Sequence, residues 1–300
     1  MEQRVTEPVA VGIGAGQQVR RWRHQMARLA RTQPLGTLAL VICLIMVFMA
    51  VFAPLVSRYD PFATSAYDRL LAPSATHWFG TDENGRDLYA RLVYGARISM
   101  YVAFFSIAIG TFIGYLAGIV SGFVGGKIDD YIQRVVDAML AFPSILLALT
   151  VVSVLGAGLD KVIAAIAITL APRAARVSRG VVLSVKENVY IDAARVIGAS
   201  SLRIMLRHVL PNTMAPFLVL ASVALGGAIL TEASLSFLGL GVPPPHPAWG
   251  RMLSGASQNL GLLAPWLMIF PGAAIMLLVL AFNLLGDALR DIWDPKLRGR

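Results

Sequence analysis

Few residues in this chain have the type and spacing that chemistry requires. The only Gly-Lys pair, Gly126-Lys127, is followed by Ile128, and Ser121 stands where a phosphate-binding P-loop needs its first glycine. The chain therefore lacks the loop that holds the phosphates of ATP in many ATPases. The four histidines have no metal-binding spacing, since they stand at positions 24, 77, 208 and 246. We expect no catalytic residues, and no cofactor or metal bound by this chain itself.

One carboxylate, Glu232, stands at the end of an apolar stretch, in the sequence ILTEASLSFLGLG. Proton-driven and sodium-driven transporters carry ionisable groups inside their membrane spans, and the middles of the other apolar stretches hold almost none. Glu232 has two interpretations: a carboxylate capped by neighbouring hydroxyls, or a contact for a substrate or partner. The sequence leaves both open, but it disfavours a secondary transporter or channel that works alone.

The most polar internal segment, 190–212, reads YIDAARVIGASSLRIMLRHVLPN. It carries Asp192 and three arginines, so it cannot lie in hydrocarbon and must be a surface between membrane spans. Gly198 permits a turn, and Pro211 ends the unit. A short helix of this kind is either an amphipathic connector or a segment shaped for a groove in another protein. The residues that helical spacing places near one face are Ala194, Ile197, Ser201, Ile204 and Met205.

The composition is that of an integral membrane protein. Of the 300 residues 57% are hydrophobic and 14% are charged, with a mean hydropathy of +0.68, whereas soluble domains have about 25% charged residues. The lone cysteine, Cys43, lies in an apolar run and forms no disulfide within the chain. We predict an all-α membrane protein with six transmembrane helices. Their approximate bounds are 35–56, 98–120, 135–155, 161–179, 215–235 and 265–285.

The lysines and arginines orient these spans. With the N-terminus inside, most of the 26 basic residues fall in inner segments, as the positive-inside rule requires. Both termini and the 190–212 segment are then cytosolic, and the net charge of +9 reflects topology rather than binding to nucleic acid. The predicted parts are a cytosolic N-terminal tail (1–34), a first transmembrane helix with an outer loop (35–97), a core of five transmembrane helices with a cytosolic loop at 180–212 (98–286), and a cytosolic C-terminal tail (287–300).

The predicted second span carries a row of glycines four residues apart. This spacing places them on one face of a helix, where another helix backbone can approach closely. We interpret the row as a packing surface, within the chain or against a partner, rather than as the general glycine enrichment of membrane helices. Its members are Gly110, Gly114, Gly118 and Gly122.

Two prolines and one loop have both functional and structural interpretations. Pro143, in AFPS, and Pro271, in IFPG, can kink spans that line a path, or can simply shape them. The outer loop from Arg58 to Arg97 is rich in turn residues and balanced in charge. It either caps the helix bundle or docks an external soluble partner.

The polar segment resembles the EAA motif of ABC importer permeases, whose pattern is Glu-Ala-Ala, three residues, Gly, nine residues, Ile, any residue, Leu-Pro. The chain departs from it twice. Asp192 stands for Glu and keeps the charge, whereas His208 stands where Ile is usual. The peptide branch of the family often reads His-Val/Ile-Leu-Pro-Asn here. The resemblance implies contact with an ATPase for Asp192, Ala193, Ala194, Gly198, Ala199, Ser200, Leu210 and Pro211.

Further motifs resemble the dipeptide/oligopeptide/nickel permease subfamily. They are FGTDENGRD at 79–87, YGARIS at 94–99, SFLGLGVPPPHPAWGRML at 236–253 and AFNLLGDALRDIWDPKLR at 281–298. Their order and the C-terminal motif are similar to the second permease subunit of a dipeptide or oligopeptide importer. The resemblance covers about residues 20–298.

The resemblance implies a type I ABC importer permease fold in a multi-pass protein of the bacterial inner membrane. It implies a second homologous permease, two ATPase subunits that bind ATP and Mg²⁺, and an external peptide-binding protein as partners. The helix around 193–206 would couple ATP hydrolysis to transport of di- or oligopeptides. The alternatives are a permease of this family for nickel or another small solute, and a membrane scaffold subunit that transports nothing.

Overall fold

The computed structural model describes residues 33–257 and 262–293, and its secondary structure within these ranges is helical apart from one isolated β-bridge between Thr81 and Asp87. The predictions for the N-terminal tail and for the end of the C-terminal motif fall at 1–32 and 294–300, outside the described residues. The helices are α2 (Pro34–Val51), α3 (Ala53–Val56), α4 (Leu88–Val124), α5 (Gly126–Leu140), α6 (Ser144–Leu155), α7 (Leu159–Lys186), α8 (Val189–Val196), α9 (Ser201–Ile204), a π-helical turn η1 (Met205–Val209), α10 (Leu210–Phe237), α11 (Trp249–Ser257) and α12 (Trp266–Trp293).

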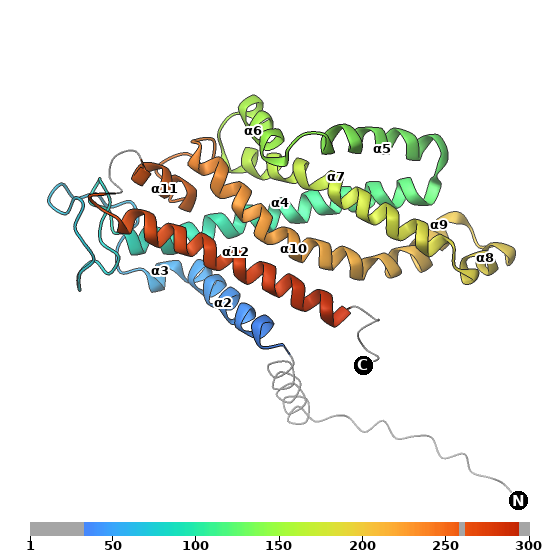
Figure 1. The fold of residues 1–300 in the computed structure, drawn as a ribbon, viewed down its shortest axis with the longest axis horizontal. Helices are drawn as coiled ribbons and strands as arrows, with labels where there is room; N and C mark the ends of the chain where they lie inside the picture. The colour runs from blue at the N-terminus through green and yellow to red at the C-terminus, as the bar shows by residue number, and fades with distance from the viewer. Residues whose placement is uncertain (1–32, 258–261, 294–300) are drawn as a thin grey trace, which may run out of the picture.

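The long helices run roughly along one axis (Figure 1). The loop 57–87 and α11 lie at one end of this axis, and α8 and α9 lie at the other. The two ends of the described chain also meet, because Gln33 Nε2 donates to Asp291 Oδ2 at 3.2 Å. The start of α2 and the end of α12 therefore lie side by side.

The helices α4 and α7 form the centre of the bundle, and the glycine row of α4 faces α7. A Cβ added to Gly110, Gly114 or Gly118 would overlap a backbone carbonyl oxygen of α7. These oxygens belong to Ala167, Ala171 and Ala175, which are also four residues apart. Since the residue numbers rise together along both helices, α4 and α7 are parallel. The row permits backbone contact where no hydrophobic effect drives helix association.

The predicted span at 135–155 is not one helix. It is divided between α5 and α6, whose axes differ by 94° across the break at 141–143. Pro143, the residue before α6, explains the break: it has no N–H to donate, and it disfavours helical conformation at Phe142. The sequence predicted a kink within one span at Pro143, whereas the structure has two separate helices that run in different directions on either side of it. Charged residues of α5 also make this half of the pair amphipathic.

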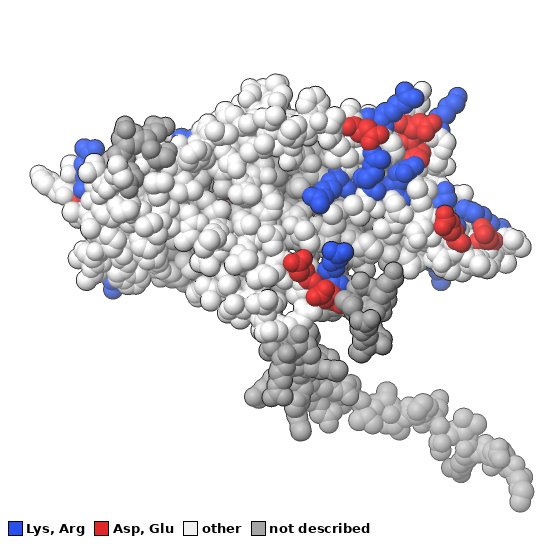
Figure 2. Space-filling model, in the orientation of Figure 1, with Lys and Arg blue, Asp and Glu red and all other residues white. Residues whose placement is uncertain are grey.

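Four helices of the described chain have the length and apolar character to cross a membrane, and the bent pair makes a fifth if it counts as one span. They are α2, α4, α12 and the continuous run Ser201–Phe237 that ends with α10. The predicted span 161–179 lies within α7, which is long but carries several charges. Uncharged side chains cover most of the visible face, and most of its charged groups lie in the half that holds α8 and α9 (Figure 2).

The helices do not begin and end where the predicted spans do. Helix α4 begins at Leu88, well before position 98, because the Asp87 carboxylate accepts the Ala90 N–H at 2.7 Å and caps the helix. The first predicted span, 35–56, breaks at Phe52, where Pro54 occupies the first turn of α3. Helix α12 continues through Trp293, so the predicted C-terminal tail at 287–300 begins inside a helix.

Candidate functional site

Helix α8 contains the first part of the predicted motif and has one buried face. Ile191 and Ala194 are buried, whereas Asp192 and Ala193 are exposed. The Asp192 carboxylate accepts a hydrogen bond from Arg195 Nη1 at 3.0 Å, one turn along the same helix. Ala194 is small, so α8 can lie close to the helices on which it packs. Asp192 faces solvent in this chain.

Gly198 ends α8 in a left-handed turn with φ of +81°. The Gly198 N–H donates to the Arg195 carbonyl and the Ala199 N–H donates to the Ala194 carbonyl, each at 3.0 Å. This is a Schellman motif, which satisfies the last carbonyls of a helix and favours glycine. Nothing lies within 4 Å of a Cβ built on Gly198, so backbone conformation and not crowding requires glycine in this chain.

The chain turns at once into α9. Ser200 caps this helix by accepting the Arg203 N–H at 3.4 Å, and Ala199 is half-buried. Leu210 and Pro211 stand at the start of α10, where the run from α9 through η1 continues without a gap. The predicted end of the unit at Pro211 was therefore wrong, since proline is tolerated in a helical first turn and here the helix continues through it.

A small apolar core anchors this segment to the bundle. Its buried residues come from α4, α7, α8, α9 and η1, so the segment rests on both central helices. Lys186 Nζ adds a polar link, since it donates to the carbonyls of Gly122 and Phe123 at 3.0 and 2.9 Å. The core consists of Tyr115, Ile119, Val182, Val185, Ile191, Ala194, Ile204 and Val209.

The outer face of the same segment exposes apolar side chains. We name the exposed set the α8–α9 patch; Val196 is its most exposed member at 87%, followed by Val189 and Ile197 at 83% each. The prediction that Ile197 and Ser201 lie near one face with Ala194 was wrong: Ala194 is buried and the other two are exposed, because the chain turns at Gly198 and the helical register breaks there. The patch consists of Val189, Val196, Ile197, Leu202 and Leu206.

A polar cluster joins α4, α5 and α7 near the α8–α9 segment. Arg179 donates to both oxygens of Asp129, from Nε at 2.7 Å and from Nη2 at 2.6 Å. Asp129 also accepts a short hydrogen bond from Ser121, which in turn accepts one from Gln133 Nε2 at 2.8 Å. Sequence reasoning placed Arg179 only at the end of a span, because no spacing rule connects it to a residue fifty positions earlier.

His208 lies beside Tyr190, with ring centroids 6.1 Å apart. Asn212 Nδ2 donates to the His208 carbonyl at 2.6 Å and to the Tyr190 hydroxyl at 3.4 Å. The histidine at the usual isoleucine position is therefore half-buried and ties η1 to the start of α8.

The remaining predicted residues lie apart from this segment. Glu232 is fully buried, and its carboxylate accepts hydrogen bonds from Ser99 Oγ at 2.9 Å and Ser236 Oγ at 2.7 Å. This arrangement matches the hydroxyl-capped interpretation. Pro271 is buried within α12, whereas Pro143 is exposed at the α5–α6 break. Within the described ranges no group of three or more histidine, cysteine, aspartate or glutamate residues could hold a metal ion.

Comparison with protein families gives the class of this helical bundle. Residues 93–299 match the family described as "Binding-protein-dependent transport system inner membrane component". Residues 21–73 match the "N-terminal TM domain of oligopeptide transport permease C". The chain belongs to this family of inner-membrane components, which are the permease subunits of ABC importers and whose ATPase is a separate subunit.

Within that class, the chain is a permease of the dipeptide/oligopeptide/nickel subfamily. It is 44% identical to the dipeptide transport system permease protein DppC of Alkalihalophilus pseudofirmus over 277 residues, 92% of this chain and 90% of that protein. It is 44% identical to the glutathione transport system permease protein GsiD of Escherichia coli over 283 residues, 94% of this chain and 93% of that protein. The GsiD protein of Pectobacterium atrosepticum is 43% identical, with 92% of each chain covered.

Proposed function

We propose that this chain imports di- or oligopeptides as one of two permease subunits in an ATP-driven importer. Relatives that match almost the whole chain are named for transport of dipeptides and of glutathione, which is itself a tripeptide. Both names support a small peptide as the solute. The chain forms half of the translocation path, and a second homologous permease forms the other half.

The α8–α9 segment couples this permease to an ATPase subunit. One observation supports the assignment most directly: the segment joins a buried core to an exposed apolar patch flanked by arginines. Exposed apolar groups at the polar end of a membrane bundle suit a protein partner better than water or lipid. Two partner ATPases bind ATP and Mg²⁺, and their closure pushes the segment and rocks the spans. Asp192, Ala193, Gly198 and Ser200 are exposed and available for this contact.

The sidedness follows from the same assignment. The ATPases are cytosolic, so α8 and α9 mark the cytosolic end and the 57–87 loop marks the outer end, where an external peptide-binding protein docks. The adjoining ends of α2 and α12, with the basic N-terminal segment, then lie on the cytosolic side. With α7 and the bent α5–α6 pair counted as spans, the chain crosses the bacterial inner membrane six times.

Reconstitution of the four-subunit importer in liposomes tests the proposal. We expect uptake of labelled di- or tripeptides that requires ATP and the binding protein. ATP-driven uptake of nickel but of no peptide would instead assign the related metal-transport function. Peptide uptake that persists without ATP would show a transporter of another class, and no ATP-dependent uptake of any solute would favour a scaffold subunit.

A further inference from the structure

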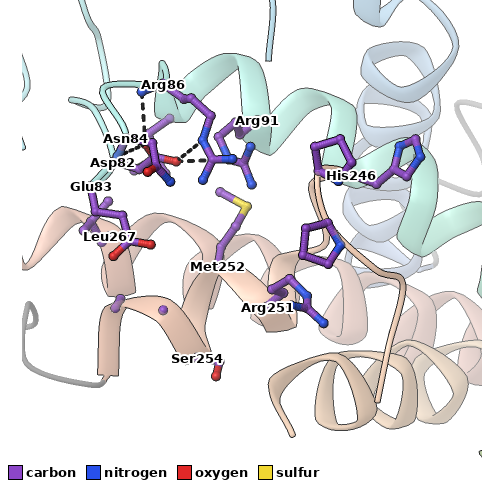
Figure 3. A pocket seen from close by; sticks show the side chains of 15 residues that line it. Asp82, Glu83, Asn84, Arg86, Arg91, His246, Arg251, Met252, Ser254 and Leu267 are labelled. Carbon is purple, nitrogen blue, oxygen red and sulfur yellow. Dashed lines mark hydrogen bonds and ion pairs between the residues drawn. The ribbon is translucent and has the colours of Figure 1, made fainter. Parts of the chain in front are cut away.

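A cavity of about 340 Å³ opens at the end of the molecule that holds the 57–87 loop. Its wall comes from the segment 82–91, from 244–256 and from Leu267 of α12. Figure 3 shows the arginines of this wall on two different elements, with Met252 of α11 between Glu83 and Arg251. The volume lies within the range of small-molecule sites, about 300–1,000 Å³.

Asp82 organises one side of the cavity. Its Oδ1 accepts the backbone N–H groups of Asn84 and Arg86 at 2.8 and 3.0 Å. Its Oδ2 accepts Arg86 Nε at 2.7 Å and lies 3.4 Å from Arg91 Nε. Asp82 and Arg91 are 8% and 6% exposed, so this arrangement is built into the protein and not formed by loose surface groups. One carboxylate therefore holds two guanidinium groups at the wall.

Arg251 of α11 supplies the third guanidinium. Its Nη2 donates to the Gly239 carbonyl at 3.3 Å, while its buried Nε has no hydrogen-bond partner in the described residues. A buried donor without a partner is costly, so a shift of the Arg251 side chain that opens Nε to a ligand or water in the cavity would be favourable. The lining holds three arginines, Arg86, Arg91 and Arg251, and two carboxylates, Asp82 and the exposed Glu83, so it has one positive charge in excess.

We propose that this cavity binds the terminal carboxylate of a short peptide on the outer side, with Arg251 as the principal donor. Arg86 and Arg91 add positive charge, and the planar guanidinium fork matches a carboxylate. Glu83 contributes a negative charge that suits the ammonium end of the same zwitterion. This inference rests on the proposed function, which supplies the outer side and the peptide.

The test uses the purified importer in detergent without its binding protein. Calorimetric titration compares dialanine with its C-terminal amide, which keeps the ammonium and lacks the carboxylate. We expect saturable binding of the free acid. The Kd of the amide should be at least about tenfold higher, because the amide loses one charge-assisted contact. Arg251→Gln weakens binding of the acid to a similar degree. Arg58→Gln is the control, because the Arg58 guanidinium lies 4.9 Å over the Trp78 ring and outside this cavity. We expect this variant to bind dialanine like the wild type.

Three results overturn the site: equal binding of acid and amide, wild-type binding by Arg251→Gln, or binding only after the binding protein is added. The last result would show that the carboxylate contact belongs to the docked binding protein. Uptake by the wild-type importer separates the two claims. ATP-driven peptide uptake without this binding rejects the cavity alone, whereas no peptide uptake under any condition rejects the proposed function and the inference with it.

Discussion

Arg179 of α7 holds Asp129 of α5 by a two-point contact, with Nε 2.7 Å from Oδ1 and Nη2 2.6 Å from Oδ2. Ser121 of α4 donates to the same carboxylate. Three helices therefore meet at one charge pair, just before α7 leads into the α8–α9 segment. Neither side chain is more than 28% exposed, so water screens the pair only in part.

Arg179→Gln is expected to destabilise the permease by about 1.5–3 kcal/mol, because it removes charge-assisted hydrogen bonds from a carboxylate that stays partly buried. Thermal denaturation in detergent measures the effect. Arg195→Gln is the matched control, since its pair with Asp192 is exposed and is expected to contribute less than about 0.5 kcal/mol. Equal shifts in Tm for the two variants would contradict the structural role of Arg179.

Gly114→Ala tests the contact between α4 and α7. A Cβ at this position overlaps the Ala171 carbonyl oxygen, so we expect a loss of about 1–3 kcal/mol from overpacking. Gly180→Ala is the control, because nothing lies within 4 Å of a Cβ built there on an exposed position of α7. The control should be neutral or gain up to about 1 kcal/mol from helix propensity. A Gly114→Ala protein as stable as the control would rule out backbone contact along the glycine row.

The glycine row shows what could be predicted from the sequence. Spacing of four identifies a smooth helix face, and composition identifies a helical membrane protein, because both depend on local periodicity. The partner of the row could not be predicted, since α7 is more than fifty residues away in sequence. The α5–α6 break could not be predicted either. Hydropathy averages over a window, whereas a single proline and the charges of α5 decide where the chain turns.

Gly198→Ala tests the turn between α8 and α9. Alanine at φ of +81° costs about 1–2 kcal/mol, so we expect a displaced α8 and a fall in both peptide uptake and ATP hydrolysis stimulated by the binding protein. Gly198→Asn should retain more activity than Gly198→Ala, because asparagine tolerates left-handed conformation better. Peptide uptake and stimulated ATP hydrolysis are measured for both variants and compared. Greater activity of Gly198→Ala than of Gly198→Asn would argue against a conformational role for Gly198.

Glu232→Gln separates a structural carboxylate from a proton relay. Its neighbours Ser99 and Ser236 donate to Glu232, and a glutamine side-chain oxygen can still accept from a hydroxyl. We expect ATP-driven uptake within about twofold of the wild type, since one neutral hydrogen bond contributes little net free energy. Glu232→Leu should lower Tm, because both hydroxyls lose their acceptor. Loss of uptake in a stable Glu232→Gln protein would instead support proton-coupled transport.

The sequence predicted where the α8–α9 segment lies in the chain, but not which of its side chains are exposed. The resemblance identified Asp192, Ala194 and Gly198, and the structure puts Ala194 against the core and Gly198 at the turn. Helical periodicity failed beyond that glycine, because it assumes one unbroken register. The exposed apolar residues on either side, such as Val196 and Leu202, give no separate signal in a chain where most residues are apolar.

The central claim is that the α8–α9 patch holds an ATPase subunit, and Ile197→Asp tests it most directly. A carboxylate at this position costs the free permease little, since Ile197 is 83% exposed, but it places an unpaired charge in the contact. Tyr67→Asp, at a residue 96% exposed in the 57–87 loop, is the control. The account predicts that Ile197→Asp permease still inserts and pairs with its partner permease but binds ATPase subunits at least about tenfold more weakly, whereas Tyr67→Asp retains them. Wild-type retention of the ATPases by Ile197→Asp, measured by quantitative co-purification, would contradict the account.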